Sequence, residues 1–286
     1  MNVKQSVSEF EGILNLRNLA DGTVISYVYW IERFLSSFDF SDSSEIALSH
    51  ALEFMTALQT ANMAGGTINT AMNAIRYYYE VMLDQVYTSR QLPKIKYSIR
   101  EINVFSQEEL EALIGKASIR VKCFILLGCD CGLRSSEVAR LRFEDLSSEK
   151  RRIRIFCSKN GKSRTVKMSD TVLNALLDYC RNERPGVRSG YLFINRHGDH
   201  LSPSTVSSLF RKLMRCTLSD TENRRFHTLR HTFATMILKG GGDLFLLKKL
   251  LGHKSLSATV RYIHYYNDDI DDAVMPSELM KWEKGK

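Results

Sequence analysis

Apolar side chains recur at helical spacing through the first ninety residues. In "TVISYVYWIERFLSSF" they line one face of a 3.6-residue repeat, as an amphipathic helix requires. The positions are Ile25, Val28, Ile31, Phe34, Leu35 and Phe38. The stretches "SEIALSHALEFMTAL" and "GGTINTAMNAIRYYYEVMLDQV" repeat this pattern. Residues 1–90 are therefore predicted to form a small helical bundle.

The periodicity breaks in "SRQLPKIKYSIREINV", where Pro93 stands among mixed basic and apolar residues. We expect a linker over residues 91–104. The following "FSQEEL" contains Ser106 and, three residues later, Glu109, which is the spacing of a capping box at the start of a helix. A second domain is thus predicted over residues 105–286.

Helical patterns dominate the second domain as well. "SIRVKCFILLGCDCG" is typical of a buried helix that stops at Gly132, and "RSSEVARLRFEDL" of a shorter helix capped by Ser135 or Ser136. Further helices are predicted at "SDTVLNALLDYC", at "SPSTVSSLFRKLMR" with Pro203 in its first position, and from His227 onward.

One stretch, "RRIRIFCSKNGKSRTVKM", changes to a period of two. Ile153 and Ile155 alternate with arginines, and an Asn160-Gly161 pair suits a tight type I′ turn, so a β-hairpin is predicted. The expected fold class is mainly α with a small β-hairpin or sheet (α+β).

The composition is that of a globular protein, with 44% hydrophobic and 25% charged residues in 286. No apolar run is long enough to cross a bilayer, and "MNVKQSVSEFEG" lacks the apolar region of a signal peptide. We expect a cytoplasmic protein without membrane contact. Six cysteines without paired CxxC spacing predict reduced core thiols, and neither disulfides nor zinc.

The net charge of +8 is unevenly distributed. Residues 1–90 hold five Lys or Arg against ten Asp or Glu, a balance of −5, which leaves 35 basic and 22 acidic residues, or +13, in the remainder. So basic a segment usually binds a polyanion, and nucleic acid is the commonest. Charge alone does not separate DNA binding from RNA binding or from a merely soluble basic surface.

The predicted hairpin is a candidate for binding phosphates. Seven basic residues and no acidic one lie between Arg151 and Lys167, so the ribbon repels itself unless solvated or laid against phosphates. Lys159 directly precedes the turn, which would project its ammonium from the tip. In an arbitrary protein, such a lysine is more often a solubilising surface charge.

Arg134 opens a predicted helix directly behind Gly132. An arginine there can make paired hydrogen bonds to a phosphate, or a salt bridge to Glu137. His227 and Arg230 stand three apart, so both can point the same way on one helix.

His231, four residues after His227, has the spacing of a zinc pair. However, "HTLRH" lacks the glutamate of the HExxH motif, and we favour a satisfied core histidine at this position.

His253 follows Gly252, and Tyr262 comes nine positions later, with Tyr265 and Tyr266 shortly after it. Several tyrosines on one helix are ordinarily explained by aromatic packing.

Taken in order, these residues resemble the tyrosine recombinase (phage integrase) family, in particular its short, Xer-type members. The resemblance rests on "CGLRSSEVARLRFEDL", "SKNGKSRTVKM", "HTLRHTFATMIL" and "LLGHKSLSATVRYIHY", four boxes in the family's order. It implies a DNA-clamping N-terminal helical domain, a C-terminal catalytic domain and six catalytic residues. These are Arg134, Lys159, His227, Arg230, His253 and Tyr262.

Position in the sequence also decides between neighbouring candidates for the catalytic lysine and the nucleophilic tyrosine. Lys159, and not Lys162, takes the family's place before the turn, while Tyr265 and Tyr266 fall too late for the nucleophile. One feature departs from the family, because its first domain usually grips DNA with a basic surface and residues 1–90 are net acidic. This suggests a narrow basic strip or a larger role in protein contacts.

The resemblance implies strand exchange without a cofactor or metal. A tyrosine that attacks the phosphodiester stores its energy as a 3′-phosphotyrosyl ester. Arg134 and Arg230 would balance the phosphate charge, and His253 would hydrogen-bond to it. Lys159 would protonate the departing 5′ oxygen, and His227 would assist proton transfer at the tyrosine.

The implied partner is double-stranded DNA with inverted-repeat core sites, bound by a homotetramer on two sites through a four-way junction. An accessory DNA-bending protein or a second recombinase can belong to such an assembly. The tail "NDDIDDAVMPSELMKWEKGK" has enough apolar residues for a short helix that docks on its own domain or on a neighbour. Integration or excision of a mobile element and resolution all use this one reaction.

Three other functions compete with recombination. A type IB topoisomerase shares the chemistry but not the short layout. A DNA-binding accessory or regulatory protein of the same fold could be catalytically silent, although all six positions hold the family's residue types. A metal-dependent nuclease would need clustered carboxylates, which the basic boxes lack.

Overall fold

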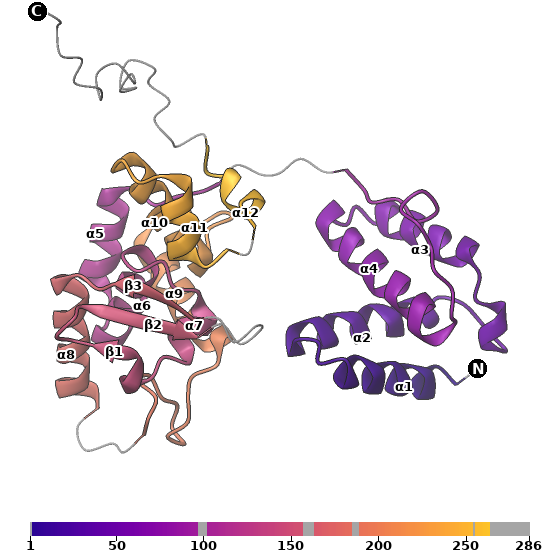
Figure 1. The fold of residues 1–286 in the computed structure, drawn as a ribbon, viewed down its shortest axis with the longest axis horizontal. Coiled ribbons are helices and arrows are strands. Elements are labelled where there is room, and N and C mark those ends of the chain that lie inside the picture. Colours follow the sequence, from indigo (N-terminus) through magenta and orange to yellow (C-terminus); the bar gives the residue numbers. More distant parts are fainter. Residues whose placement is uncertain (1, 97–101, 157–162, 185–188, 254, 264–286) are drawn as a thin grey trace, which may run out of the picture. The chain divides into compact units, whose positions relative to one another are not determined.

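The chain divides into two compact units, residues 1–100 and residues 101–286 (Figure 1). The computed structural model describes residues 2–96, 102–156, 163–184, 189–253 and 255–263. None of the helices in these ranges is both long and apolar enough to span a membrane.

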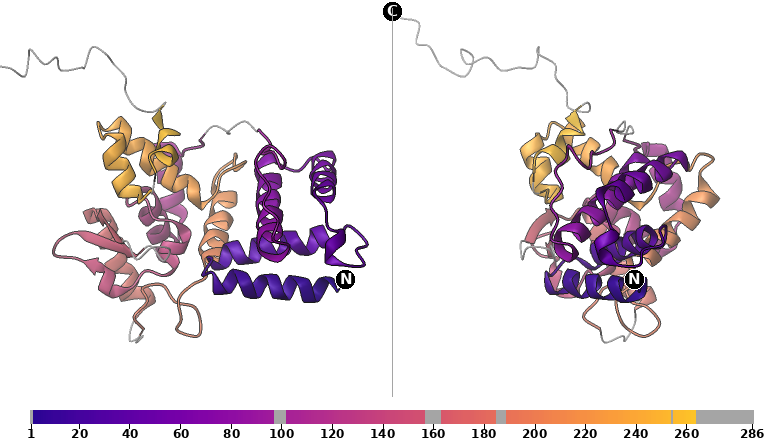
Figure 2. Two further views of the ribbon diagram at one scale, coloured as in Figure 1. Left: turned by 45° about the vertical axis from the view of Figure 1, so that its right-hand side comes forward. Right: turned by 90° about the vertical axis from the view of Figure 1, so that its right-hand side faces the viewer.

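The first unit is helical, as its apolar periodicity predicts. Its elements are α1 (Val3–Leu16), α2 (Asp21–Leu35), the 3₁₀ turn η1 (Ser43–Glu45), α3 (Leu48–Thr60) and α4 (Gly65–Met82). Helices α1 and α2 run side by side (Figure 2). The fully buried Phe34 of α2 packs edge-on against Phe54 of α3 and Tyr79 of α4, with ring centroids 5.5 and 6.3 Å away. These contacts confirm the predicted bundle.

The segment that follows α4 is tied to that helix. The side chain of Asn69 donates to the carbonyl of Ile95 at 2.9 Å and accepts from its N–H at 2.8 Å. Arg76 donates to the carbonyl of Leu92 at 2.6 Å, and the Leu92 side chain is fully buried. Residues 92–95, which the sequence pattern assigns to the linker, therefore pack as part of the first unit.

The second unit is mainly α with one small sheet. Its helices are α5 (Gln107–Lys116), α6 (Ile119–Cys129), α7 (Ser135–Ala139), α8 (Asp170–Glu183), α9 (Pro203–Thr217), α10 (Phe226–Lys239), α11 (Leu244–Leu251) and α12 (Ser257–Val260), with a 3₁₀ turn η2 (Phe143–Asp145). The strands are β1 (Leu146–Ser147), β2 (Arg152–Phe156) and β3 (Ser163–Lys167).

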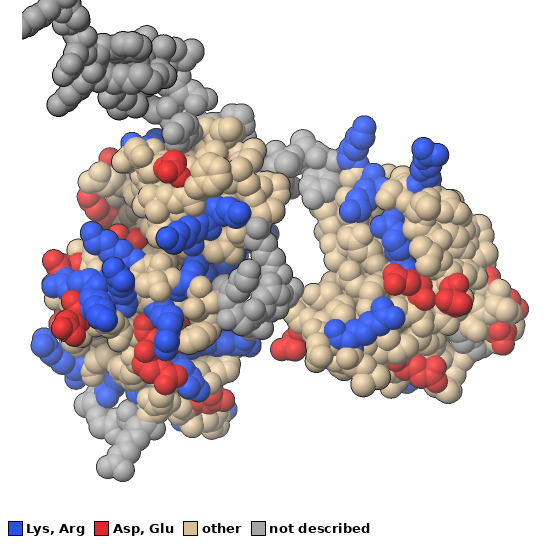
Figure 3. Space-filling view, viewed as in Figure 1, with Lys and Arg blue, Asp and Glu red and all other residues tan. Residues whose placement is uncertain are grey.

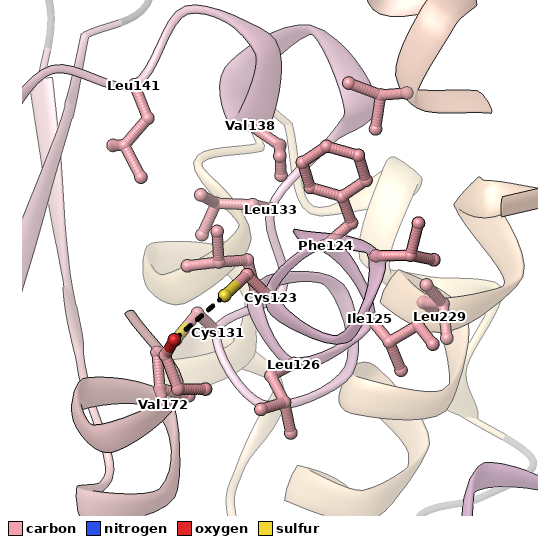
Figure 4. Close-up of a cluster of buried hydrophobic side chains, with 14 of the residues drawn as sticks. Cys123, Phe124, Ile125, Leu126, Cys131, Leu133, Val138, Leu141, Val172 and Leu229 are labelled. Atoms are coloured by element: carbon pink, nitrogen blue, oxygen red, sulfur yellow. Dashed lines mark hydrogen bonds between the residues drawn. The ribbon is translucent and has the colours of Figure 1, made fainter. Parts of the chain in front are cut away.

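Helix α6 is the centre of this unit because its residues from Cys123 to Gly128 are all buried. It packs against α8 and α10, and Phe124 and Ile125 are fully buried (Figure 4). The Cys123 thiol donates to the carbonyl of Ala175 in α8 at 3.2 Å. The five described cysteines are free thiols, and Cys157 lies outside the described residues.

The sheet is antiparallel in the order β1-β2-β3. In the β2–β3 pair, Ile153 lies opposite Val166 and Ile155 opposite Arg164, and these four side chains face the core. The predicted hairpin strands are thus confirmed, whereas the Asn160-Gly161 turn lies outside the described residues. Strand β1 was not predicted, because two residues are too short to show a period of two.

Helix caps agree only in part with the sequence pattern. The capping box is confirmed, since Ser106 accepts from the Glu109 N–H and its own N–H donates to the Glu109 carboxylate. The predicted cap of α7 by Ser135 or Ser136 is wrong. Arg134 is the N-cap residue, and its N–H donates to the Glu137 carboxylate at 2.8 Å.

Candidate active site

Arg134 stands at the start of α7, where the chain turns out of the buried helix α6. Its Nη1 donates to Oε1 of Glu137 at 2.9 Å, so one carboxylate holds both the backbone and the side chain of this arginine. The Arg134 side chain is 36% exposed and that of Glu137 only 10%. The guanidinium therefore keeps an accessible edge for a ligand, while the carboxylate that orients it is shielded from water.

Glu137 is also bound by Arg164 of β3. Nη1 and Nη2 of Arg164 each donate to one carboxylate oxygen at 2.7 Å, a bidentate pair in which the arginine side chain is 6% exposed. Burial by itself would raise the pKa of the Glu137 carboxyl. The hydrogen bonds and charge of Arg164, with those of Arg134, outweigh burial and lower this pKa to about 2.

Arg230 extends from α10 into the interior and is 1% exposed. It donates at 2.5 Å to the carbonyl of Gly132, just before Arg134, and at 2.5 Å to the carbonyl of Leu251 at the end of α11. Its Nη1 lies 3.9 Å from Oε2 of Glu137. Burial and then Arg134 lower the pKa of Arg230 to about 9, so the side chain stays cationic at neutral pH.

His253 follows the left-handed C-cap of α11 at Gly252 (φ +66°). A Cβ on Gly252 would lie 2.9 Å from Cδ of Arg164, so the backbone before His253 packs directly on that arginine. The ring Nδ1 of His253 is hydrogen-bonded to Oγ1 of the buried Thr259 at 2.9 Å. Burial, then the charges of Arg230 and Arg134, lower the His253 pKa to about 4, which keeps the ring neutral.

Tyr262 is 2% exposed and lies in an apolar cluster of α10 and α11 that includes Leu238 and Leu247. Its hydroxyl is hydrogen-bonded to Nδ1 of His231 at 2.6 Å. Burial raises the pKa of the phenol, an effect that the charges of Arg261 and Arg230 oppose. The hydroxyl is therefore protonated at neutral pH and has a ring nitrogen as its partner.

His227 lies on the first turn of α10 with an exposed side chain. Its ring meets that of His231 edge-on, with centroids 4.6 Å apart. Although the residue is exposed overall, desolvation of its ring by neighbouring groups, followed by the charges of Arg230 and Arg134, lowers the His227 pKa to about 4. The His227 ring is thus neutral at physiological pH.

The structure brings five of the six residues named from the sequence into one site: Arg134, His227, Arg230, His253 and Tyr262. Glu137 and the backbone contacts of Arg230 connect the start of α7 to the end of α11, and the two histidines connect α10 to Tyr262. Lys159 and its alternative Lys162 lie outside the described residues, as do Tyr265 and Tyr266. Among the described residues, no group of three His, Cys, Asp or Glu side chains is arranged to hold a metal ion.

Comparison with known families identifies this arrangement. Residues 99–268, more than half of the chain, match the model of the phage integrase family. The chain belongs to the phage integrase family. Residues 7–89 match a second model, the N-terminal SAM-like domain of phage integrases.

Several known proteins are similar to this chain over most of its length. Tyrosine recombinase XerA of Pyrococcus horikoshii is 28% identical, over 96% of this chain and 94% of its own. The fold is similar to that of a lambda integrase dimer bound to a COC′ core site, with 17% identity, a TM-score of 0.72, and coverage of 90% and 97% of the two chains. A lambda integrase tetramer bound to a Holliday junction has 16% identity, a TM-score of 0.70, and coverage of 88% and 77%.

Sequence reasoning missed three polar residues of the site. Glu137 was considered only as a salt-bridge partner of Arg134, and His231 as a core histidine. Arg164 was counted among the hairpin's phosphate-facing charges, yet it lies on the buried face of β3 with Ile153 and Ile155. The period of two could have placed Arg164 on that face, where an arginine needs a buried anionic partner.

Basic residues also gather outside the site. On the face drawn in Figure 3, many Lys and Arg side chains lie over the strands of this integrase-family protein. A separate cleft of about 310 Å³ lies between α9 and the segment before α10. It is lined by Arg211, Met214, Arg215, Thr221, Asn223, Arg224 and Arg225.

Proposed function

We propose that Tyr262 is the nucleophile with which this tyrosine site-specific recombinase cuts and rejoins DNA. Its phenolic oxygen attacks the scissile phosphorus, the bond from phosphorus to the 5′ oxygen breaks, and a 3′-phosphotyrosyl ester forms. The 5′ hydroxyl of a partner strand then attacks that ester and releases the tyrosine. Each step exchanges one phosphate ester for another, so resealing needs no ATP.

The observation that carries this proposal is the convergence of Arg134, Arg230, His253 and Tyr262 from four separate segments of the chain. Arg134 has an exposed edge, and it is held by a carboxylate that is already ionised. Such fixed cations stabilise the charge on the nonbridging oxygens without reorganising during the reaction. We assign Arg134 and Arg230 to that charge and His253 to a hydrogen bond with the phosphate.

We assign the remaining two positions from the family resemblance. Lys159 supplies the proton that the 5′ oxygen takes up as it leaves. His227, whose side chain is exposed, assists proton transfer at the tyrosine. Loss of Arg134 or Lys159 is expected to slow cleavage on the order of a hundredfold or more.

For the whole molecule, we propose that the two units, residues 1–100 and 101–286, clamp DNA between them. Four copies act on two inverted-repeat core sites through a four-way junction. The lambda integrase tetramer on a Holliday junction supports this assembly. The basic cleft at α9 is proposed to contact the phosphate backbone. Integration or excision of a mobile element and resolution would all use this one reaction.

Covalent trapping tests the nucleophile. The probe is a set of DNA duplexes enriched from a random-sequence pool by binding to this protein. Each duplex is prepared in several versions, with one nick at a different position in each. Cleavage beside the nick releases a short strand, so the reaction cannot be reversed. In the presence of EDTA, the wild type is expected to form a protein–DNA adduct that survives denaturation, and Tyr262→Phe to form none.

The neighbouring tyrosines provide matched controls. Tyr265→Phe and Tyr266→Phe are expected to form the adduct as the wild type does. The wild type and all variants could instead bind the DNA and form no adduct, even with a second recombinase present. That result would indicate a catalytically silent DNA-binding protein. Cleavage that EDTA abolishes would indicate a metal-dependent nuclease.

A further inference from the structure

The hydroxyl of Tyr262 is in contact with His231, which the family pattern leaves without a role. Nδ1 of His231 and Oη of Tyr262 are 2.6 Å apart, and the tyrosine is 2% exposed. His227, the residue that the resemblance assigns to the tyrosine proton, meets the ring of His231 edge-on and has an exposed side chain.

A phenol that attacks phosphorus must lose its proton as the new bond forms. At a buried hydroxyl, water does not reach the oxygen freely, so the acceptor has to be a protein group already within hydrogen-bond distance. The ring nitrogen of His231 meets this requirement. Its imidazole is neutral at physiological pH, because burial and then His227 and Arg261 lower the His231 pKa to about 3.

We propose that His231 is the catalytic residue that accepts the proton of Tyr262 during cleavage and returns it during rejoining. The O–H bond of the tyrosine breaks as its oxygen bonds to phosphorus, and the proton moves to Nδ1. The electron pair of the breaking ester bond leaves on the 5′ oxygen, which is protonated separately. This inference rests on the proposed role of Tyr262 as the nucleophile.

Because of the charges around His231, the basicity of its imidazole should also depend on bound DNA. In the free protein, burial and then the charges of His227, Arg261 and Arg230 disfavour the imidazolium, so the hydrogen bond holds the Tyr262 hydroxyl without ionising it. A phosphate bound beside Arg230 brings a negative charge that offsets these cations. His231 thereby becomes a stronger base when the scissile phosphate is in place.

The experiment compares the two histidines on the same α10 turn. Single-turnover adduct formation is measured with His231→Ala and His227→Ala, at saturating protein on the nicked duplexes described above. Each variant is prepared with tyrosine and with 3,5-difluorotyrosine at position 262, whose phenol ionises more readily. His231→Ala is expected to lose roughly a hundredfold in rate. In His231→Ala, difluorotyrosine should return the rate of adduct formation most of the way to the wild-type rate. In His227→Ala, it should change that rate little.

Several outcomes would overturn the inference. A His231→Ala protein that cleaves at the wild-type rate or faster would mean that the contact only restrains Tyr262. Rescue confined to His227→Ala would assign the proton to His227. His231→Gln, which keeps a hydrogen-bond acceptor but is not a base, is expected to be as slow as His231→Ala and equally rescued. An adduct formed by Tyr262→Phe would refute the proposed nucleophile instead.

Discussion

At the scale of single residues, the site depends on the balance of charge around Glu137. Its carboxylate is paired with Arg164 and Arg134 and lies 3.9 Å from a nitrogen of the buried Arg230. A buried charge that loses its partner destabilises the fold far more than a surface pair does. Glu137 therefore supports both the stability of the second unit and the orientation of the arginines.

Replacement of this carboxylate should lower stability in a pH-dependent way. Glu137→Gln is expected to reduce the free energy of unfolding by about 3–5 kcal/mol at pH 7, because it leaves buried arginines without a counter-ion. The pKa of Glu137 is lowered from near 4.5 to about 2, so its contribution is complete above pH 4.5 and is lost as the pH falls toward 2. Urea denaturation at several pH values between 7 and 4 measures the free energy of unfolding of both proteins. The difference between wild type and Glu137→Gln should begin to decrease near pH 4.

The matched control is Glu144→Gln, which removes an exposed partner of Arg142 at 2.9 Å. Exposed pairs contribute at most about 1 kcal/mol, so this variant should remain close to wild type. Equal losses in the two variants would contradict the central role of Glu137.

At the scale of elements, the turn between α6 and α7 sets the position of Arg134. Gly132 has φ +67°, which suits glycine, and its carbonyl accepts the hydrogen bond from Arg230. A Cβ at this position would lie 2.5 Å from Cδ1 of Phe233 in α10. Helix α10 can therefore approach this turn only because position 132 has no side chain.

Two glycine substitutions separate the packing effect from the backbone effect. Gly132→Ala should destabilise the protein by about 2–5 kcal/mol, from left-handed strain and overpacking together. Gly198→Ala, at φ +82° with no atom within 4 Å of the added Cβ, should lose only about 1–2 kcal/mol. Urea denaturation measures both, and adduct formation should fall only with Gly132→Ala. Similar losses would show that contact with Phe233 is unimportant.

At the scale of the whole molecule, charge is divided between the two units. Residues 1–100 hold eight Lys or Arg against ten Asp or Glu, a balance of −2, and residues 101–286 hold 32 against 22, a balance of +10. In the first unit, Arg17 and Arg33 lie over the rings of Tyr77 and Trp30, at 5.5 and 5.2 Å. In the second unit, Arg211 and Arg215 line a cleft. Long-range attraction of DNA should therefore come mainly from the second unit.

Salt dependence of DNA binding tests this division. The slope of log affinity against log salt should decrease in magnitude by about 2 when Arg211 and Arg215 are both changed to glutamine, since each neutralised phosphate contributes roughly 0.9. The double change Arg17→Gln and Arg33→Gln should alter the slope little. Fluorescence anisotropy with one duplex at several salt concentrations gives both slopes. The opposite ranking would place the main phosphate contacts in the first unit.

The sequence alone determined the features that depend on local spacing. Helical periodicity identified the bundle, a period of two identified the hairpin strands, and the order of four motifs identified the family. Arg134, His227, Arg230, His253 and Tyr262 could be named as candidates because each occupies a fixed position within such a motif.

Tertiary structure decided which of these residues touch, and through which partners. His231 lies 31 residues from Tyr262 in the chain, and Arg164 lies 27 residues from Glu137, so no local pattern reports either contact. The first pair joins α10 to the segment after α11, and the second joins β3 to α7. Burial in those contacts excludes water from the hydrogen bonds that His231 and Arg164 make. Both residues are therefore parts of the site, although the sequence pattern predicted a core histidine and a hairpin surface charge.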